Sequence, residues 1–124
     1  MAEEKGLLWI VEDDESIALC LKMILEDHGY RVAVAHTLQA ARRLEGRPAL
    51  VLLDFLLPDG NGVAFLPELE QRFAGTQVIL LTALDRVGSS RFPNHVEYLP
   101  KPFHNRELLT MIERKLHGTE SMSA

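Results

Sequence analysis

The sequence of 124 residues is poor in several residue types, and each shortage excludes a class of protein. Its single cysteine, Cys20, has no partner for an internal disulfide, which favours a reducing compartment. No apolar run approaches the ~20 residues of a membrane-spanning helix. The first residues, 1–6, are charged rather than apolar, unlike a signal peptide. We therefore expect a cytoplasmic protein without a membrane segment.

Basic residues are also scarce. The chain has 13 Lys and Arg against 18 Asp and Glu, a net charge of −5, which disfavours direct contact with nucleic acid. Hydrophobic residues make up 47% of the sequence, as in an ordinary globular protein, and the length suits one domain with a substantial core. We expect this domain at residues 1–117, followed by a flexible tail or linker stub at 118–124.

Short, continuous apolar runs alternate with helical patterns along the chain. The runs are typical of strands buried on both faces, and they occupy residues 7–11, 31–35, 49–54, 77–82 and 96–99. Apolar residues at helical spacing, with suitable capping residues, predict helices at 16–28, 37–45, 63–73 and 105–116. This alternation predicts an α/β fold, a doubly wound five-stranded parallel sheet with helices on both faces.

Three local features complete this prediction. Ser89, Ser90 and Pro93 lie where a fourth helix is due, so a short or irregular helix is expected within 84–94. Cys20 lies among apolar residues of the first helix, and we interpret it as a core residue rather than a nucleophile. Trp9 is expected to pack within the first strand.

Polar residues follow the apolar strands directly. Glu12 and Asp13 follow the first strand, Asp54 ends the third, Thr82 ends the fourth, and Lys101 follows the fifth. Because the carboxyl ends of parallel strands meet at one edge of the sheet, where α/β proteins bind ligands, these side chains should gather there.

The gathered carboxylates would repel one another, and a hard divalent cation removes this repulsion. Mg²⁺ prefers oxygen ligands and suits two or three carboxylates, whereas the histidines show no zinc-ligand spacing. A single acid after a strand is more often a helix cap, and Asp14 is interpreted as one. The acids combined with Thr82 and Lys101 indicate a site instead.

Four motifs, in order and at this spacing, carry a family resemblance: Leu-Trp-Ile-Val-Glu-Asp-Asp from Leu8, Leu-Leu-Asp-Phe-Leu-Leu-Pro-Asp-Gly-Asn-Gly ending at Gly62, Leu-Leu-Thr-Ala ending at Ala83, and Tyr-Leu-Pro-Lys-Pro-Phe from Tyr98. Over residues 7–117 the chain resembles the response regulator receiver domain of two-component signal transduction. The resemblance implies a flavodoxin-like sheet with strand order 2-1-3-4-5. Receiver domains are known to have this order.

The resemblance also implies roles for particular residues. Asp54 would be the phospho-acceptor. The metal ligands for Mg²⁺ would be Glu12 (mainly through water), Asp13, Asp54 and the carbonyl of Leu56. Thr82 and Lys101 would contact the phosphoryl group, Thr82 and Tyr98 would form the switch, and the Lys101–Pro102 bond would be cis.

By the same resemblance, the chain is a signalling domain that catalyses only its own phosphorylation and dephosphorylation. The phosphoryl group would come from a sensor histidine kinase or a histidine phosphotransfer protein. Phosphorylation would switch the surface of the fourth helix, the last strand and the last helix, which would signal to an output domain or protein. A phosphorylation-dependent homodimer is a further partner that the family suggests.

Two departures from the family and three alternatives stay open. The first departure is that the interval between Thr82 and Lys101 is shorter than usual in the family. The second is that Leu56 and Leu84 flank the expected route of the attacking water to the phosphoryl group, so we hypothesise that this group is long-lived. The main alternative is a pseudo-receiver that acts as a phosphorylation-independent protein-interaction module. A flavodoxin-type electron carrier is disfavoured because residues 12–14 would repel a flavin phosphate, and a metal-dependent phosphatase is the remaining alternative.

Overall fold

A computed structural model describes residues 5–83 and 96–117. Its main sheet has five parallel strands in the order β2-β1-β3-β6-β7. The strands are β1 (Leu7–Val11), β2 (Arg31–Ala35), β3 (Leu50–Asp54), β6 (Gln77–Thr82) and β7 (Glu97–Pro100). Counted within this sheet alone, the order is 2-1-3-4-5, so the predicted doubly wound fold is confirmed. A short antiparallel hairpin, β4 (Leu56–Leu57) and β5 (Gly60–Asn61), follows β3 where only a turn was predicted.

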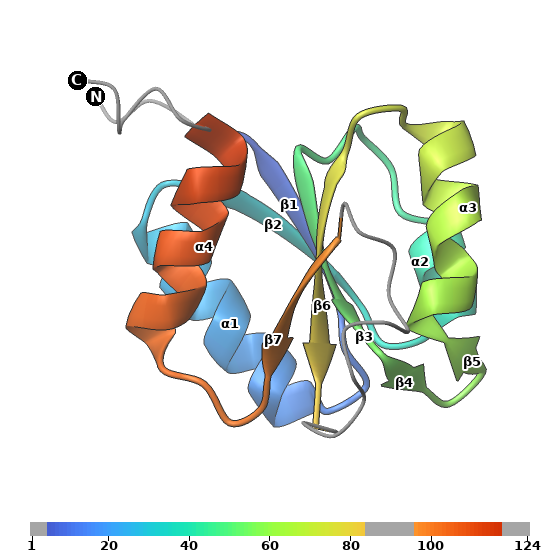
Figure 1. The fold of residues 1–124 in the computed structure, drawn as a ribbon, viewed down its shortest axis with the longest axis horizontal. Helices are drawn as coiled ribbons and strands as arrows, with labels where there is room; N and C mark the ends of the chain where they lie inside the picture. The colour runs from blue at the N-terminus through green and yellow to red at the C-terminus, as the bar shows by residue number, and fades with distance from the viewer. Residues whose placement is uncertain (1–4, 84–95, 118–124) are drawn as a thin grey trace.

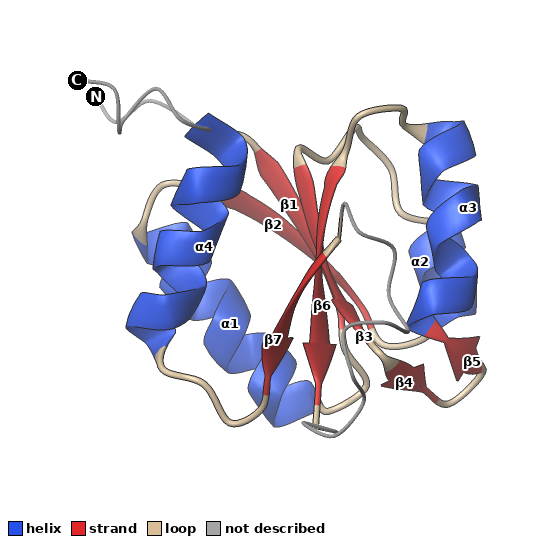
Figure 2. Cartoon of the chain, viewed as in Figure 1, coloured by secondary structure: helices blue, strands red, loops and turns tan. Residues whose placement is uncertain are grey.

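In the part of the chain that the structure describes, two pairs of helices cover the two faces of the sheet (Figures 1 and 2). The helices α1 (Glu15–Asp27) and α4 (Asn105–His117) pack on one face, and α2 (Leu38–Arg42) and α3 (Gly62–Arg72) pack on the other. Successive strand residues alternate between these two layers. Every residue of the central strand β3 is buried, which explains its continuous apolar sequence up to the final carboxylate.

Side-chain caps define where the helices begin. The Asp14 carboxylate accepts a hydrogen bond from the Ile17 N–H at 3.0 Å and caps α1, as predicted. Thr37 caps α2, which ends at Arg42 rather than continuing to residue 45. The reason is a tighter last turn, in which the N–H groups of Arg43 and Leu44 bond three residues back, to Ala40 and Ala41.

The core contains Trp9 as expected, but not Cys20. The Trp9 ring is fully buried and meets Phe73 edge to face, with ring centres 5.4 Å apart. The prediction for Cys20 is wrong: its side chain is exposed. The core face of α1 is formed by Ala18, Leu21 and Leu25, so Cys20 lies beside this stripe and not on it.

Some predictions fall on residues that the structure does not describe. They are the irregular helix within 84–94, the position of Leu84, and the tail at 118–124. Among the described residues, no helix has both the length and the apolar character needed to cross a membrane.

Candidate functional site

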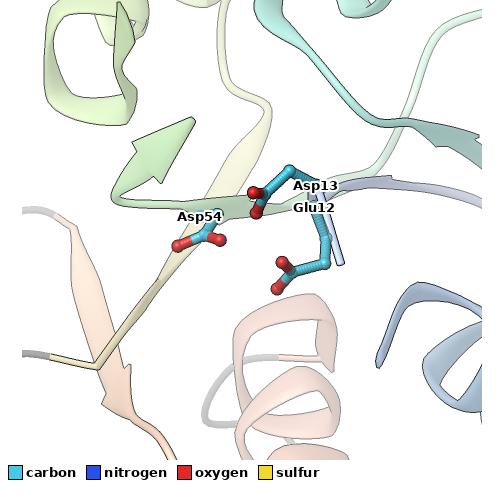
Figure 3. Close-up of side chains that lie close together, drawn as sticks. All are labelled: Glu12, Asp13 and Asp54. Carbon is cyan, nitrogen blue, oxygen red and sulfur yellow. The ribbon is translucent and has the colours of Figure 1, made fainter. Parts of the chain in front are cut away.

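Three carboxylates converge at the carboxyl edge of the sheet (Figure 3). Glu12 and Asp13 follow β1, and Asp54 is the last residue of the neighbouring strand β3. Each offers one oxygen, and these oxygens all lie within 4.8 Å of one another. The predicted juxtaposition of acids from separate strands is therefore present in the structure.

The pleat of the sheet determines which side chains share a face. Ile10 and Leu52 pack in the layer of α1 and α4, so Glu12 and Asp54, each two residues further along, project toward that same layer. Lys101 lies two residues after Leu99, which packs in this layer too. The two acids and the lysine therefore come from three strands to one side of the sheet.

Lys101 bridges the two buried acids. Its Nζ lies 2.6 Å from Glu12 Oε1 and 3.3 Å from Asp54 Oδ2. The second oxygen of Glu12, Oε2, accepts the N–H of Asp14 at 3.0 Å. Glu12 is completely buried and Asp54 is 6% exposed, so solvent screens these interactions little. One ammonium cannot neutralise both carboxylates, and Asp13 adds a third, exposed one.

The pKa values of Glu12 and Lys101 reflect this crowding. The pKa of the Glu12 carboxyl is raised to about 7, chiefly by burial and also by nearby Asp54, while the hydrogen bonds from Lys101 and Asp14 offset only part of the rise. Burial lowers the pKa of Lys101, but the hydrogen bond to Glu12 and the charges of Asp54 and Glu12 outweigh it, so the pKa rises above its usual value. The lysine is thus held as a cation beside an acid that is hard to ionise.

The loop after Asp54 is held close to the site. The N–H of Leu56 approaches Asp54 Oδ1 at 3.4 Å, and the N–H of Gly62 donates to the Phe55 carbonyl at 2.8 Å. A Cβ atom at Gly62 would collide with the backbone carbonyl oxygen of Asp54. Only glycine allows α3 to begin this close to the end of β3. The side chain of Leu56 is 56% exposed at this edge.

Thr82 and Tyr98 lie on the other face of the sheet. Leu80, two residues before Thr82, packs in the layer of α2 and α3, and Tyr98 packs against that layer and pairs with Leu80. Thr82 is 1% exposed and Tyr98 is half-buried. The Thr82 carbonyl accepts the N–H of Lys101 at 2.6 Å, which connects this strand end to the lysine, and the Lys101–Pro102 peptide bond is cis.

The donor set fits a hard divalent cation. All three side-chain donors are carboxylate oxygens, two of them come from one short segment, and within residues 5–83 and 96–117 no histidine or cysteine joins the group. Mg²⁺ takes such oxygens together with water and phosphate oxygens, whereas a thiolate or imidazole set would favour softer metals. A cation here would also relieve the repulsion between Asp54 and Glu12, which adds to the effect of burial on the pKa of Glu12.

A family model for the response regulator receiver domain matches residues 8–113. The chain belongs to this family. The receiver domain is similar to a curated relative, the uncharacterized transcriptional regulatory protein YkoG of Bacillus subtilis strain 168. The two are 40% identical over 127 residues, which cover 95% of this chain and 55% of that protein. The receiver domain thus spans about half the length of the curated relatives it matches.

Solved structures of receiver domains show the same fold. A CheY-like receiver domain protein from Methanospirillum hungatei JF-1 has a TM-score of 0.83 and 31% identity, and the match covers 94% of this chain and 97% of that one. The receiver domain of the sensor histidine kinase PA1611 from Pseudomonas aeruginosa PAO1, described with a magnesium ion in its active-site cleft, has a TM-score of 0.77 and 27% identity over 91% of this chain and 98% of that one.

Sequence reasoning gave no role in the site to two polar side chains, His36 and Asp59. His36 is hydrogen-bonded to the backbone carbonyl of Glu12, and Asp59, in the turn of the hairpin after Asp54, accepts the N–H groups of Leu38 and Gln39. The only signal in the sequence was that Asp59 lies in a dense turn motif, residues 58–62, which begins four residues after Asp54.

Proposed function

We propose that the chain is a phosphorylation-activated receiver that accepts a phosphoryl group on Asp54 in a Mg²⁺-dependent reaction. One observation supports this most: the buried carboxylate of Asp54, at the end of β3, lies close to Lys101 and to two further carboxylates. Such a site combines a nucleophile, a fixed cation and a set of metal ligands. We propose Glu12, Asp13, Asp54 and the Leu56 carbonyl as the groups that would hold the metal.

In this reaction an oxygen of Asp54 attacks phosphorus and forms an acyl phosphate, while the bond from phosphorus to the donor histidine nitrogen breaks. Bound Mg²⁺ would supply positive charge to the phosphoryl oxygens. Lys101, already held 3.3 Å from Asp54, supplies the protein's own positive charge on these oxygens. Thr82, from the other face of the sheet, would move in to donate a hydrogen bond to the new phosphate. The Tyr98 ring would occupy the space that Thr82 leaves, so the event changes the surface around β7.

Mass spectrometry tests the acceptor residue. Incubation with acetyl phosphate and Mg²⁺ should add about 80 Da, the mass of one phosphoryl group. Asp54→Asn should abolish the gain, whereas Asp27→Asn, at the exposed end of α1, should keep it. A protein that gains no mass would contradict the proposal and favour the pseudo-receiver, a phosphorylation-independent interaction module.

The phosphodonor would be a sensor histidine kinase or a histidine phosphotransfer protein. An open apolar groove of about 580 Å³ lies beside the site, and Lys101 lines it together with Ile17, Cys20 and Leu21 of α1 and with Phe103. Lys101 lines the groove and also contacts Asp54, so a protein that fills the groove is brought next to Asp54. We therefore propose the groove as the contact surface for the donor.

Phosphotransfer profiling tests this contact. Histidine kinases encoded in the same genome are autophosphorylated and mixed briefly with the wild-type chain or with Cys20→Glu, which places a charge in the apolar groove. The variant should accept more slowly from the best donor but equally fast from acetyl phosphate. An equal rate from the kinase would contradict the groove as the contact surface.

The remaining proposals concern the surroundings of the domain. We propose a receiver domain at residues 1–117 with a linker or tail after it, a cytoplasmic location, and no direct contact with nucleic acid by this domain. Relatives named as transcriptional regulatory proteins support an output domain or partner protein. A homodimer that forms on phosphorylation should appear as a doubled mass in light scattering with beryllofluoride and Mg²⁺.

A further inference from the structure

Two side chains outside the acidic cluster, His36 and Asp59, connect the two segments that border it. One loop follows β1 and holds Glu12 and Asp13. The other follows Asp54 and folds back as the β4–β5 hairpin, at the end of the sheet toward which the arrows of β6 and β7 point (Figure 1). The turn 36–39, which leads from β2 into α2, makes hydrogen bonds to both loops.

His36 bonds the turn to the first loop. Its Nδ1 lies 2.9 Å from the backbone carbonyl oxygen of Glu12, and because a carbonyl only accepts, Nδ1 is the donor. Beside it, the N–H of Glu12 donates to the carbonyl of Ala35 at 2.9 Å. The imidazole therefore extends the pairing of β1 with β2 past the ends of both strands. It holds the backbone of the residue whose buried carboxylate contacts Lys101.

Asp59 bonds the same turn to the hairpin. Its two carboxylate oxygens accept the N–H groups of Leu38 and Gln39, each at 2.9 Å. These are the first N–H groups of α2, which have no partner within the helix. The same hydrogen bonds lower the pKa of Asp59, so the carboxylate stays ionised. The next N–H, of Ala40, donates instead to Thr37 Oγ1 at 3.0 Å, within the turn itself.

We propose that His36 and Asp59 are positioning residues that hold the loop of Glu12 and Asp13 and the hairpin after Asp54 at metal-binding spacing. This inference rests on the proposed function, because the spacing matters only if the carboxylates share a cation. Without a brace, three mutually repelling carboxylates would move apart, and metal binding would have to bring them together again. Groups that orient metal ligands typically change metal affinity by about 10- to 100-fold, and a brace that acts through the backbone should contribute about three- to tenfold.

Metal titrations of four variants test the brace. Mn²⁺ binding is followed by electron paramagnetic resonance, with Mg²⁺ as competitor. Asp59→Ala and His36→Leu each remove one link. His36→Asn keeps an N–H donor near the position of Nδ1, and Thr37→Ala removes a cap of α2 that does not reach the hairpin. Chemical denaturation of each variant shows that it is folded.

The brace predicts that Asp59→Ala and His36→Leu raise the Kd for Mg²⁺ about three- to tenfold, while Thr37→Ala and His36→Asn stay near the wild-type value. An unchanged Kd in both of the first two variants would overturn the proposal, as would an equal loss in Thr37→Ala, which would assign the effect to the stability of α2. If the wild-type chain binds neither cation, the proposed function fails as well. The acetyl phosphate experiment on Asp54→Asn tests that function separately.

Discussion

At the scale of single residues, Glu12 and Lys101 dominate the energetics of the site. Glu12 directly follows β1 and is fully buried although its side chain is ionisable, and the compensating charge of Lys101 lies 2.6 Å away. A buried ion pair stabilises weakly when complete but costs several kcal/mol when one partner is lost. Both groups therefore affect stability and metal binding together.

Magnesium affinity should depend on pH near neutrality. The pKa of Glu12 is raised from 4.5 to about 7 in the folded chain, so between these values the folded state holds a proton that the unfolded state has released. Its contribution to stability therefore falls as pH rises from 4.5 to about 7. Metal binding needs the ionised acid, so the affinity for Mg²⁺ should rise with pH up to about 7 and level off above it.

Competition titrations with Mn²⁺ at several pH values measure this effect. Glu12→Gln removes the titrating group and should flatten the dependence. A slope that is the same in the variant and the wild type would assign the titration to another residue.

Removal of the lysine charge should destabilise the chain most at alkaline pH. The pKa of Lys101 is raised in the folded state, so its contribution is present at all pH values below its usual 10.5. Lys101→Met leaves Glu12 and Asp54 without a cation and should lower the unfolding free energy by about 2–3 kcal/mol at mildly alkaline pH. At acid pH the loss should shrink as the carboxyls become protonated.

Urea denaturation across pH measures this difference. The matched control is Lys22→Met, because Lys22 pairs with Glu26 at 3.0 Å on the exposed face of α1. It should change stability by less than about 0.5 kcal/mol. Equal losses in both variants, or a loss that does not depend on pH, would contradict the role of Lys101.

Leu56 bears on the lifetime of the phosphoryl group. Its side chain is 56% exposed beside Asp54, where it can hinder an attacking water molecule. Leu56→Asn replaces this barrier with a polar group and should shorten the half-life of the acyl phosphate several-fold, as measured by loss of the added mass with time. A wild-type half-life of seconds to about a minute would contradict the hypothesis of a long-lived state.

At the scale of elements, the start of α3 is tied to the end of β3. Gly62 is the first residue of α3, and the missing side chain allows it to lie against the carbonyl of Asp54. Gly62→Ala should lower the unfolding free energy by about 2 kcal/mol or more, because the obstacle is backbone that cannot move aside, and it should slow phosphorylation.

Gly75→Ala provides the comparison for thermal unfolding. That position has a φ of +91° but open space around it, so its cost is conformational strain alone, about 1 kcal/mol. Gly75→Ala should leave the rate of phosphorylation unchanged. If Gly62→Ala is no worse than Gly75→Ala in either measurement, the close approach has no consequence.

The strands and the site acids were predictable from sequence because both depend on local rules. A buried parallel strand requires an apolar run, and the pleat then fixes the face to which Glu12 or Asp54 projects. Cys20 was misplaced because Leu19 and Met23, although apolar, are each 57% exposed, so apolar residues surround more than the core stripe of α1. His36 and Asp59 were missed because their partners are backbone groups that only the tertiary fold brings near.

At the scale of the whole molecule, metal binding and stability should be linked. Only the folded chain brings Glu12, Asp13 and Asp54 within 4.8 Å of one another, so Mg²⁺ should bind this state preferentially. At a concentration of about 100 times Kd, Mg²⁺ should raise the unfolding free energy by about 2.7 kcal/mol.

Denaturant titrations with and without Mg²⁺ measure this linkage. Asp13→Asn should lose most of the effect, because it removes an exposed ligand and leaves the buried pair of Glu12 with Lys101 in place. If Ca²⁺ and Mg²⁺ stabilise the wild type equally, and stabilise Asp13→Asn just as much, the effect is a general salt effect instead.

The position of Lys101 on the α1 side of the sheet has a consequence for how this sequence can change in evolution. A slip of one residue in β7 would turn Lys101 away from the acids and bring Pro100 toward them, since neighbouring side chains lie on opposite faces. Insertions and deletions should therefore be tolerated ahead of Val96 but not between Tyr98 and Lys101. Among natural variants, segment length should differ before this strand and stay constant within it.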